Sequence, residues 1–303
     1  LNPMEPNRIR HHMNVNNYFF TSYSLHNEWK GFNIYYDKDG YRTKPGKKLN
    51  KYNLNRIAFL GDSFTQAWQV TYDETFVGLL ENSLPSSNLK NFGTASYSPI
   101  IYLVQILNDV KEFKPSHVII QICDNDIRDD GIYFKRANSN NINNLEYIDG
   151  GKEKLIITLY RYSYFLRFIR KYQQIIKYNY FFGSDGKDPL SLKFDFYKNI
   201  KNEKHLTNKI IKKINDLSTK QGFKLYYIYI PNRNLVNNNC CNNIPNFKSF
   251  KEFIGKEKFI DLSNYFSNSN KKIYFEKDPH LSAYGHQLVA KAIEDRIFED
   301  LIK

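Results

Sequence analysis

Hydrophobic positions along the chain gather into short runs that alternate with longer stretches of helical spacing. The short runs, rich in β-branched and aromatic residues, predict strands over residues 56–60, 89–92, 117–123, 224–230 and 259–262. Apolar residues spaced three and four apart predict helices over residues 74–84, 99–113, 197–221 and 283–302. This alternation predicts an α/β fold with a parallel sheet and helical crossovers.

The five strands favour a flavodoxin-like sheet, with the order 2-1-3-4-5 in chain numbering and helices on both faces. The carboxyl ends of the first three strands then lie next to one another, and the loop before the last helix lies across from them. Residues 1–50 are expected to be an extension that packs on a catalytic domain spanning 51–303. Within that domain, residues 127–196 form an insertion that is expected to cap the active site.

The first strand ends on Gly61, and Ser63 follows on a turn just before a helical pattern. A serine there is held rigidly in the crevice where open α/β sheets bind ligands, which suits a nucleophile. A helix-capping role is the alternative, because serine is common wherever a strand gives way to a helix.

An aspartate and a histidine share one loop near the other end of the chain, at Asp278 and His280. A serine hydroxyl needs a base to accept its proton, and an imidazole needs a carboxylate to hold its tautomer. Ser63, His280 and Asp278 supply these three roles.

Two further strand ends carry groups suited to an oxyanion hole. Gly93 follows the second strand and allows a backbone N–H to approach a substrate, and Asn125 follows the third strand and offers an amide donor. Together with the N–H of Ser63, these groups are the candidate oxyanion donors.

At this point the chain resembles a known family, the SGNH (GDSL) hydrolases, whose four motif blocks carry Ser, Gly, Asn and His in that order. The matching segments are GDSF with Ser63, NFGTASYSP with Gly93, CDNDIRDD with Asn125, and DPHLSAYGH with Asp278 and His280. The resemblance implies a three-layer α/β/α fold and a serine esterase or O-acyltransferase that needs no cofactor and no metal.

The match has two departures. Family members usually place the aspartate three residues before the histidine, whereas here Lys277 is at that position and Asp278 stands two residues before His280. This D-x-H spacing resembles polysaccharide O-acetyltransferase-like members. Cys123 stands where the third block usually has glycine, directly before Asp124. Neither departure removes a catalytic group.

Composition limits the remaining possibilities. The 303 residues are 41% hydrophobic and carry a formal net charge of +13, enough to attract an anionic glycan or membrane surface. No nucleic-acid-binding motif accompanies the charge, so nucleic acid is not an expected partner. Cysteines at 123, 240 and 241 form neither a disulfide framework nor a zinc spacing. The oligomeric state is left open.

No run of apolar residues is long enough to span a membrane or to form a signal peptide. The chain begins at Leu1, and relatives with this layout often carry an N-terminal anchor. The expected location is therefore the cell envelope, outside the cytoplasm with an anchor absent from this chain, and a cytoplasmic location stays open.

Several other polar residues have structural interpretations. Residues 160–171 are aromatic and basic at helical spacing, typical of a cap helix or of a helix on a membrane or glycan surface. Arg42 either reaches the substrate crevice or pairs with surface carboxylates. Asp62 and Asp126 are expected to support the turns that they adjoin, and His286 is expected to pack its helix on the sheet.

The alternatives to an esterase are weaker. The pair His11 and His12 lacks the partners of a metal site. Carboxylates at 124, 129 and 130 invite a glycosidase interpretation, but nothing separates their pKa values. The sequence predicts acyl transfer through an acyl-serine on O-acetyl groups of a carbohydrate or cell-envelope polysaccharide. A non-catalytic glycan-binding or assembly protein that keeps the fold is the alternative.

Overall fold

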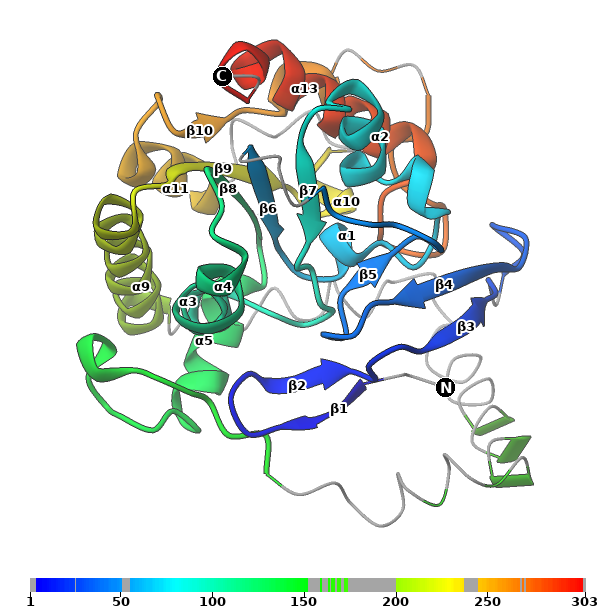
Figure 1. The fold of residues 1–303 in the computed structure, drawn as a ribbon, viewed down its shortest axis with the longest axis horizontal. Helices are drawn as coiled ribbons and strands as arrows, with labels where there is room; N and C mark the ends of the chain where they lie inside the picture. The colour runs from blue at the N-terminus through cyan, green and yellow to red at the C-terminus, as the bar shows by residue number, and fades with distance from the viewer. Residues whose placement is uncertain are drawn as a thin grey trace.

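The computed structural model describes residues 4–24, 26–50, 55–151, 200–236, 245–267, 269 and 271–301, with isolated residues between 159 and 173. Its centre is a five-stranded parallel sheet in the order β10-β9-β8-β6-β7 (Figure 1). The strands are β6 (Arg56–Leu60), β7 (Asn88–Asn91), β8 (His117–Cys123), β9 (Lys224–Ile230) and β10 (Phe259–Ile260). Numbered along the chain, this order is 2-1-3-4-5, so the predicted topology is confirmed.

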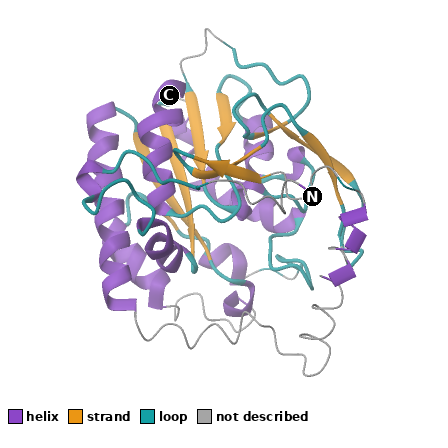
Figure 2. Ribbon diagram, turned by 90° about the horizontal axis from the view of Figure 1, so that it is seen from below, coloured by secondary structure: helices purple, strands orange, loops and turns teal. Residues whose placement is uncertain are grey.

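Helices cover both faces of the sheet (Figure 2). Ile57 and Phe59 of β6 pack in one cluster with α2 (Phe76–Ser83) and α13 (Ala283–Leu301). Ala58 and Leu60, on the opposite face, pack in a second cluster. The helices of that cluster include α3 (Pro99–Gln105), its continuation η2 (Ile106–Val110) and α4 (Lys111–Phe113), α5 (Asp126–Phe134), α9 (Ile200–Gln221) and α11 (Pro245–Ile254).

Strand β8 is buried at all seven of its positions because β6 and β9 flank it and helices cover both of its faces. A strand buried on both faces shows an almost continuous apolar run, so β8 could be predicted from the sequence. Each fully buried Ile or Phe in the sheet contributes about 1.5–3 kcal/mol of transfer free energy. The core therefore fixes the strand ends, and with them the positions of the motif blocks.

Before the sheet, the chain forms two antiparallel units that the sequence pattern did not predict. A hairpin pairs β1 (Met4–Asn7) with β2 (His11–Asn14), and a second sheet joins β3 (Phe19–Ser22), β4 (Phe32–Tyr36) and β5 (Arg42–Thr43). These strands have two to five residues and bury few side chains, so their alternation is too short to be read from the sequence.

The remaining elements are short: α1 (Ser63–Gln66), η1 (Tyr72–Glu74), η3 (Ile142–Asn144), α10 (Arg233–Val236) and α12 (Ser263–Ser267). None of the helices in the described residues combines the length and the apolar character needed to cross a bilayer.

The expected insertion begins inside α5 and continues beside the N-terminal hairpin, where Ile148 forms bridges with Arg10 and Ala137. Most of residues 152–199, including most of the aromatic and basic stretch 160–171, lies outside the described residues. The same holds for Cys240 and Cys241. The cap therefore stays a prediction.

Candidate active site

The turn after β6 places Ser63 at the first position of α1, half-buried at the carboxyl edge of the sheet. Asp62 caps this helix, because its Oδ1 accepts the Phe64 N–H at 2.9 Å. At position 61 a Cβ would come within 2.0 Å of Thr65 Oγ1 and 2.5 Å of Gln121 Oε1. Gly61 therefore lets the strand turn sharply against α1, and the predicted supporting role of Asp62 is seen.

Arg42, on β5, holds the other end of α1. Its guanidinium is 2% exposed and donates to the carbonyls of Gln66 and Val70, each at 2.6 Å, and to that of Ala67. Both sequence interpretations of Arg42 are therefore wrong. The side chain faces neither the crevice nor a surface carboxylate, and instead satisfies carbonyl groups that the end of a helix leaves without intrahelical partners.

The three residues predicted to form a triad lie together although 217 positions separate Ser63 from His280. His280 Nε2 is 2.8 Å from Ser63 Oγ, and His280 Nδ1 is 2.6 Å from Asp278 Oδ1. With Nδ1–H donating to the carboxylate, Nε2 is left to accept the serine proton. This geometry matches the activation of a nucleophile by a base.

The D-x-H spacing fits this geometry through a tight turn, in which Asp278 Oδ1 also accepts the His280 backbone N–H at 3.0 Å. Burial acts to raise the pKa of Asp278, but the hydrogen bond and charge of His280 outweigh it, so the pKa is lowered. The carboxylate is thus held in its charged form beside the imidazole.

A residue that sequence reasoning missed, Gln69, joins this group. Its side chain is 7% exposed, its Nε2 lies 3.0 Å from His280 Nδ1, and its hydrogen bond to Asp278 helps to lower the pKa of that carboxyl. Gln69 follows α1 outside any motif block, so no pattern in the sequence singled it out. It joins the nucleophile segment to the loop that carries the base.

The expectation for the Gly93 amide needs correction. Its N–H donates to Asn91 Oδ1 at 2.8 Å, so this donor is already taken by the turn. A Cβ at Gly93 would lie 2.7 Å from Thr65 Cβ and from Gln66 N. The glycine is therefore needed for close packing of this loop against α1.

The same loop offers another amide. Within residues 93–97, the amides of Thr94, Ala95 and Tyr97 also donate to partners in the protein, whereas that of Ser96 has no such bond in the described part of the chain. Ser96 is exposed and left-handed, with φ +67°, and its carbonyl accepts the Tyr133 hydroxyl at 2.6 Å. A positive φ at a non-glycine residue is uncommon, and such outliers gather at functional sites.

Asn125, the other predicted donor, lies at the end of β8 as expected. Its Oδ1 accepts the Cys123 thiol at 2.9 Å, and its Nδ2 donates to Asp129 Oδ2 at 2.7 Å. Because a side-chain amide carries two N–H groups, one is left for a ligand. These two contacts fix which way the amide points.

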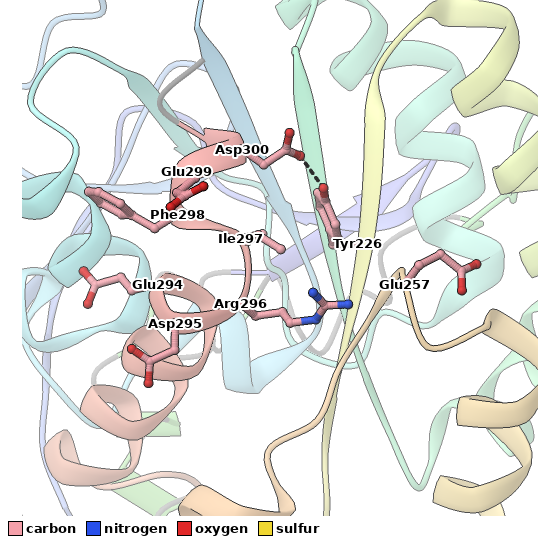
Figure 3. A pocket seen from close by; sticks show the side chains of 9 residues that line it. All are labelled: Tyr226, Glu257, Glu294, Asp295, Arg296, Ile297, Phe298, Glu299 and Asp300. Carbon is pink, nitrogen blue, oxygen red and sulfur yellow. Dashed lines mark hydrogen bonds between the residues drawn. The ribbon is translucent and has the colours of Figure 1, made fainter.

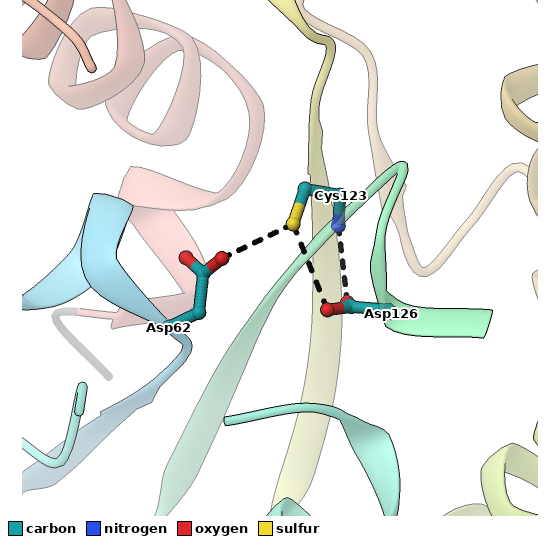
Figure 4. A group of neighbouring side chains, drawn as sticks. All are labelled: Asp62, Cys123 and Asp126. Carbon is teal, nitrogen blue, oxygen red and sulfur yellow. Dashed lines mark hydrogen bonds between the residues drawn. The ribbon is translucent and has the colours of Figure 1, made fainter. Parts of the chain in front are cut away.

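Two carboxyl groups and a thiol lie beneath the nucleophile turn (Figure 4). Cys123 Sγ is 3.2 Å from Asp62 Oδ2 and 3.6 Å from Asp126 Oδ1, and Asp126 Oδ2 accepts the Cys123 N–H. Among the described residues, this is the group whose atoms are close enough together to ligate a metal. Burial raises the pKa of all three side chains, which disfavours their charged forms, and the orienting role predicted for Asp126 is seen.

The carboxylates that invited a glycosidase interpretation have structural partners. Asp124 accepts the Tyr229 hydroxyl and the Asn232 N–H, and Asp130 accepts Ser98, Ile100 and Thr207. Burial raises the pKa of Asp130 to about 7. Both side chains tie helices and strands together.

Two histidine features are structural. His286 is 1% exposed and stacks on Phe76, and burial lowers its pKa to about 3, so it packs α13 against α2 in its neutral form. His11 Nδ1 lies 2.9 Å from His12 Nδ1, and His12 Nε2 lies 2.8 Å from the carbonyl of Ala95. The pair thus connects the N-terminal hairpin to the loop that carries Ser96.

A cavity of about 540 Å³ lies away from these residues (Figure 3). It is lined by Tyr226, near the start of β9, by Glu257 and by residues 294–300 of α13. The last residues of α13 lie near the amino end of β6, because Asn55 donates to the Leu301 carbonyl. The cavity is therefore at the edge of the sheet opposite Ser63.

No protein-family model matches this sequence, and no curated protein matches it. Solved structures that it resembles include esterase EstA from Pseudoalteromonas sp., with 12% identity and a TM-score of 0.44 over 82% of this chain and 100% of that one. A member of the lipolytic G-D-S-L family from Veillonella parvula shows 13% identity and a TM-score of 0.40, covering 79% and 96% of the two chains. The family 3 carbohydrate esterase of Clostridium thermocellum shows 14% and 0.43, covering 82% and 96%.

The secondary structure of this chain fixes where each motif block lies. Ser63 follows β6, Gly93 follows β7, Asn125 follows β8, and His280 precedes α13. This sheet order, with the four blocks in sequence around its carboxyl edge, agrees with the fold that the resemblance to the SGNH (GDSL) hydrolases implies.

Proposed function

We propose that this protein is a serine esterase or O-acyltransferase that works through an acyl-serine on O-acetyl groups of a carbohydrate. The observation that carries the proposal is the pair of contacts made by His280, 2.8 Å to Ser63 Oγ and 2.6 Å to Asp278. A structural histidine does not need both a serine and a carboxylate on opposite ring nitrogens at the open edge of a sheet.

In the proposed reaction, Ser63 Oγ attacks the acyl carbonyl carbon while its proton passes to His280 Nε2. The ester C–O bond then breaks, and the leaving alcohol takes that proton. Water or a sugar hydroxyl next attacks the acyl-serine carbonyl and gives its proton to His280 Nε2. The bond from the acyl carbon to Ser63 Oγ then breaks, Ser63 Oγ takes that proton from His280, and the free acid or a new ester is released. Asp278 holds the imidazole and stabilises its charged form.

Negative charge on the carbonyl oxygen needs donors during both attacks. We assign this role to the Ser63 N–H, to the free N–H of Asn125 and to the Ser96 N–H in place of that of Gly93. Loop contacts support the choice of Ser96, since Ala95 N–H binds Gln66 Oε1 at 2.8 Å and holds the loop against α1.

The acetylated carbohydrate is supported by the D-x-H spacing and by the net charge of +13, which suits an acidic polysaccharide. From the family resemblance we also propose a location in the cell envelope, outside the cytoplasm, and we propose that the insertion 127–196 caps the site. The acyl acceptor decides between hydrolysis and transfer.

The test is covalent labelling with a fluorophosphonate probe, read by intact-mass and peptide mass spectrometry. We expect one adduct, on Ser63, that is absent from Ser63→Ala and slowed at least 1,000-fold, as an order-of-magnitude estimate, in His280→Ala. Ser86→Ala changes an exposed serine and is the matched control, with labelling like that of the unchanged protein. Folded protein without a Ser63 adduct would favour a binding protein that keeps this fold.

Acetyl transfer is separated from hydrolysis by supplying an activated acetyl ester with and without sugar acceptors. Formation of acetyl-sugar at the expense of acetate indicates a transferase. Acetate release that no acceptor reduces indicates an esterase.

A further inference from the structure

The loop that carries the base, residues 275–280, contains no helix or strand. It is closed by one backbone bond, from Phe275 N–H to the His280 carbonyl at 3.1 Å. Such a loop has no ladder of its own to hold Asp278 and His280 against Ser63, so its shape depends on side chains that satisfy its backbone.

One carboxylate from the N-terminal segment satisfies three consecutive amides of this loop. Glu28 Oε1 accepts the N–H groups of Glu276 and Lys277, the second at 2.9 Å, and Oε2 accepts that of Asp278 at 2.9 Å. Pro279 has no N–H, and the amide of His280 binds Asp278. Every N–H from 276 to 280 is therefore held by either Glu28 or Asp278.

Glu28 is itself held in a turn that contacts the nucleophile segment. Its N–H donates to Ser24 Oγ at 2.9 Å, and the neighbouring Trp29 donates to Ser22 Oγ at 3.2 Å. Ser22 in turn donates to the carbonyl of Trp68, just after α1, at 2.7 Å. The Trp29 ring packs on Phe275 with centroids 5.1 Å apart. This turn therefore touches both the segment after Ser63 and the loop before His280.

From this arrangement we infer that Glu28 is a positioning residue for acyl transfer. It holds the three amides so that Asp278 and His280 stay in register with Ser63. The inference rests on the proposed function, since it deepens the account of that same site. The N-terminal segment thus contributes to the reaction through Glu28, which lies outside all four motif blocks.

Glu28 is expected to matter more for rate than for stability. The side chains of Glu276 and Lys277 are exposed, so water can satisfy their amides when the carboxylate is removed. What water cannot do is fix the loop in one position, and small displacements of catalytic groups cost up to about 100-fold in rate.

The experiment compares Glu28→Gln and Glu28→Ala with the unchanged protein in fluorophosphonate labelling. We expect the maximal labelling rate to fall by about 10-fold for Gln, which keeps one acceptor oxygen, and by about 100-fold for Ala. The half-saturating probe concentration stays the same. Glu146→Gln, an identical substitution at an exposed site, is the control and labels at the original rate.

Hydrogen exchange read by mass spectrometry supplies a second measurement that needs no activity. Glu28→Gln should exchange faster in peptides covering 275–280 and equally in peptides of β8. Unchanged exchange there, or equal labelling rates in all three proteins, would overturn the inference. A wild-type protein without a Ser63 adduct contradicts the proposed function alone, since exchange still decides whether Glu28 holds the loop.

Discussion

The two halves of the candidate triad are supported in different ways. Ser63 stands on a helix whose two ends are held by buried groups, Asp62 at 2% exposed and Arg42 at 2% exposed. Asp278 and His280 stand on a partly exposed loop that Glu28 holds from one side and Arg233 from the other, through the carbonyls of 275 and 276. The nucleophile is thus fixed by the core and the base by a few polar side chains.

This difference predicts that the two halves fail in different ways. Substitutions beneath the nucleophile leave buried groups unsatisfied, and so they lower the free energy of unfolding. Substitutions beneath the base expose groups that water can satisfy, and so they lower the rate while the protein stays folded. Arg42→Gln and Gln69→Met test this division directly, and variants of Asp130 and Ser96 test the packing around it.

Arg42→Gln should give the largest effect on stability. The substitution removes the guanidinium donors from three buried carbonyls, and we expect a loss of about 3 kcal/mol in the free energy of unfolding. Urea unfolding followed by circular dichroism measures it. Arg8→Gln, at an exposed arginine, is the control. A variant as stable as the control would show that α1 is not held from β5.

Asp130→Asn should change how stability depends on pH. Burial raises the pKa of Asp130 to about 7, above that of the unfolded chain, so its contribution is greatest below about pH 4 and is lost as the pH rises to about 7. The upper limit of this slope is about 1.4 kcal/mol per pH unit. We expect unfolding midpoints of the variant to fall less steeply between pH 4 and 7.

Parallel slopes for the two proteins would mean that Asp130 is ionised in the folded state. Labelling of Ser63 by the probe serves as the control. It should be the same in both proteins at one pH, because Asp130 supports the helices and does not contact the triad.

Gln69→Met should affect activity more than stability. Its amide helps to lower the pKa of Asp278, so its loss raises that pKa and moves the acid limb of the labelling profile to higher pH. Because the pKa of Asp278 lies below its usual value, the effect should appear only at acid pH, where one unit of pKa corresponds to about a 10-fold slower reaction well below about pH 4. The exposed Gln287→Met is the matched control. An unshifted profile would assign Gln69 to packing alone.

Ser96→Gly should give the smallest effect. Glycine adopts φ +67° without strain and keeps the backbone N–H, so activity should persist and stability should change by less than about 1 kcal/mol. Ser96→Val puts a β-branched residue in the same left-handed conformation, which is strained, so we expect this variant to lose activity and stability. If Val were tolerated, the left-handed backbone would not be required.

Much of the site could be predicted because three of the four motif blocks lie at the ends of strands. Gly61, Asp62 and Ser63 follow a buried strand, and the strand boundaries at 56–60, 117–123 and 224–230 agree with the structure. The parallel order then brings Asn125 to the same edge. Periodicity sufficed here because a buried strand carries an apolar signal throughout its length.

The sequence did not predict contacts between segments that lack a recognisable motif or periodicity. Glu28, Arg42 and Gln69 lie in loops or in a two-residue strand, and nothing in their neighbours marks them. Gly93 was assigned a donor role by its place in a block, yet its amide binds Asn91. Which amide a loop leaves free is decided by hydrogen bonds that only the folded chain contains.

By itself the sequence predicted the α/β class and the sheet order and singled out Ser63, Asp278 and His280 as candidate residues, because apolar periodicity and the motif blocks are local features of the chain. The tertiary structure decided how those residues are held. Arg42 binds carbonyls at the end of α1, and Glu28 binds amides of the loop before His280. In each case the backbone groups are distant in sequence and adjacent in space. Such partners are selected by the packing of the whole chain, which no local pattern records.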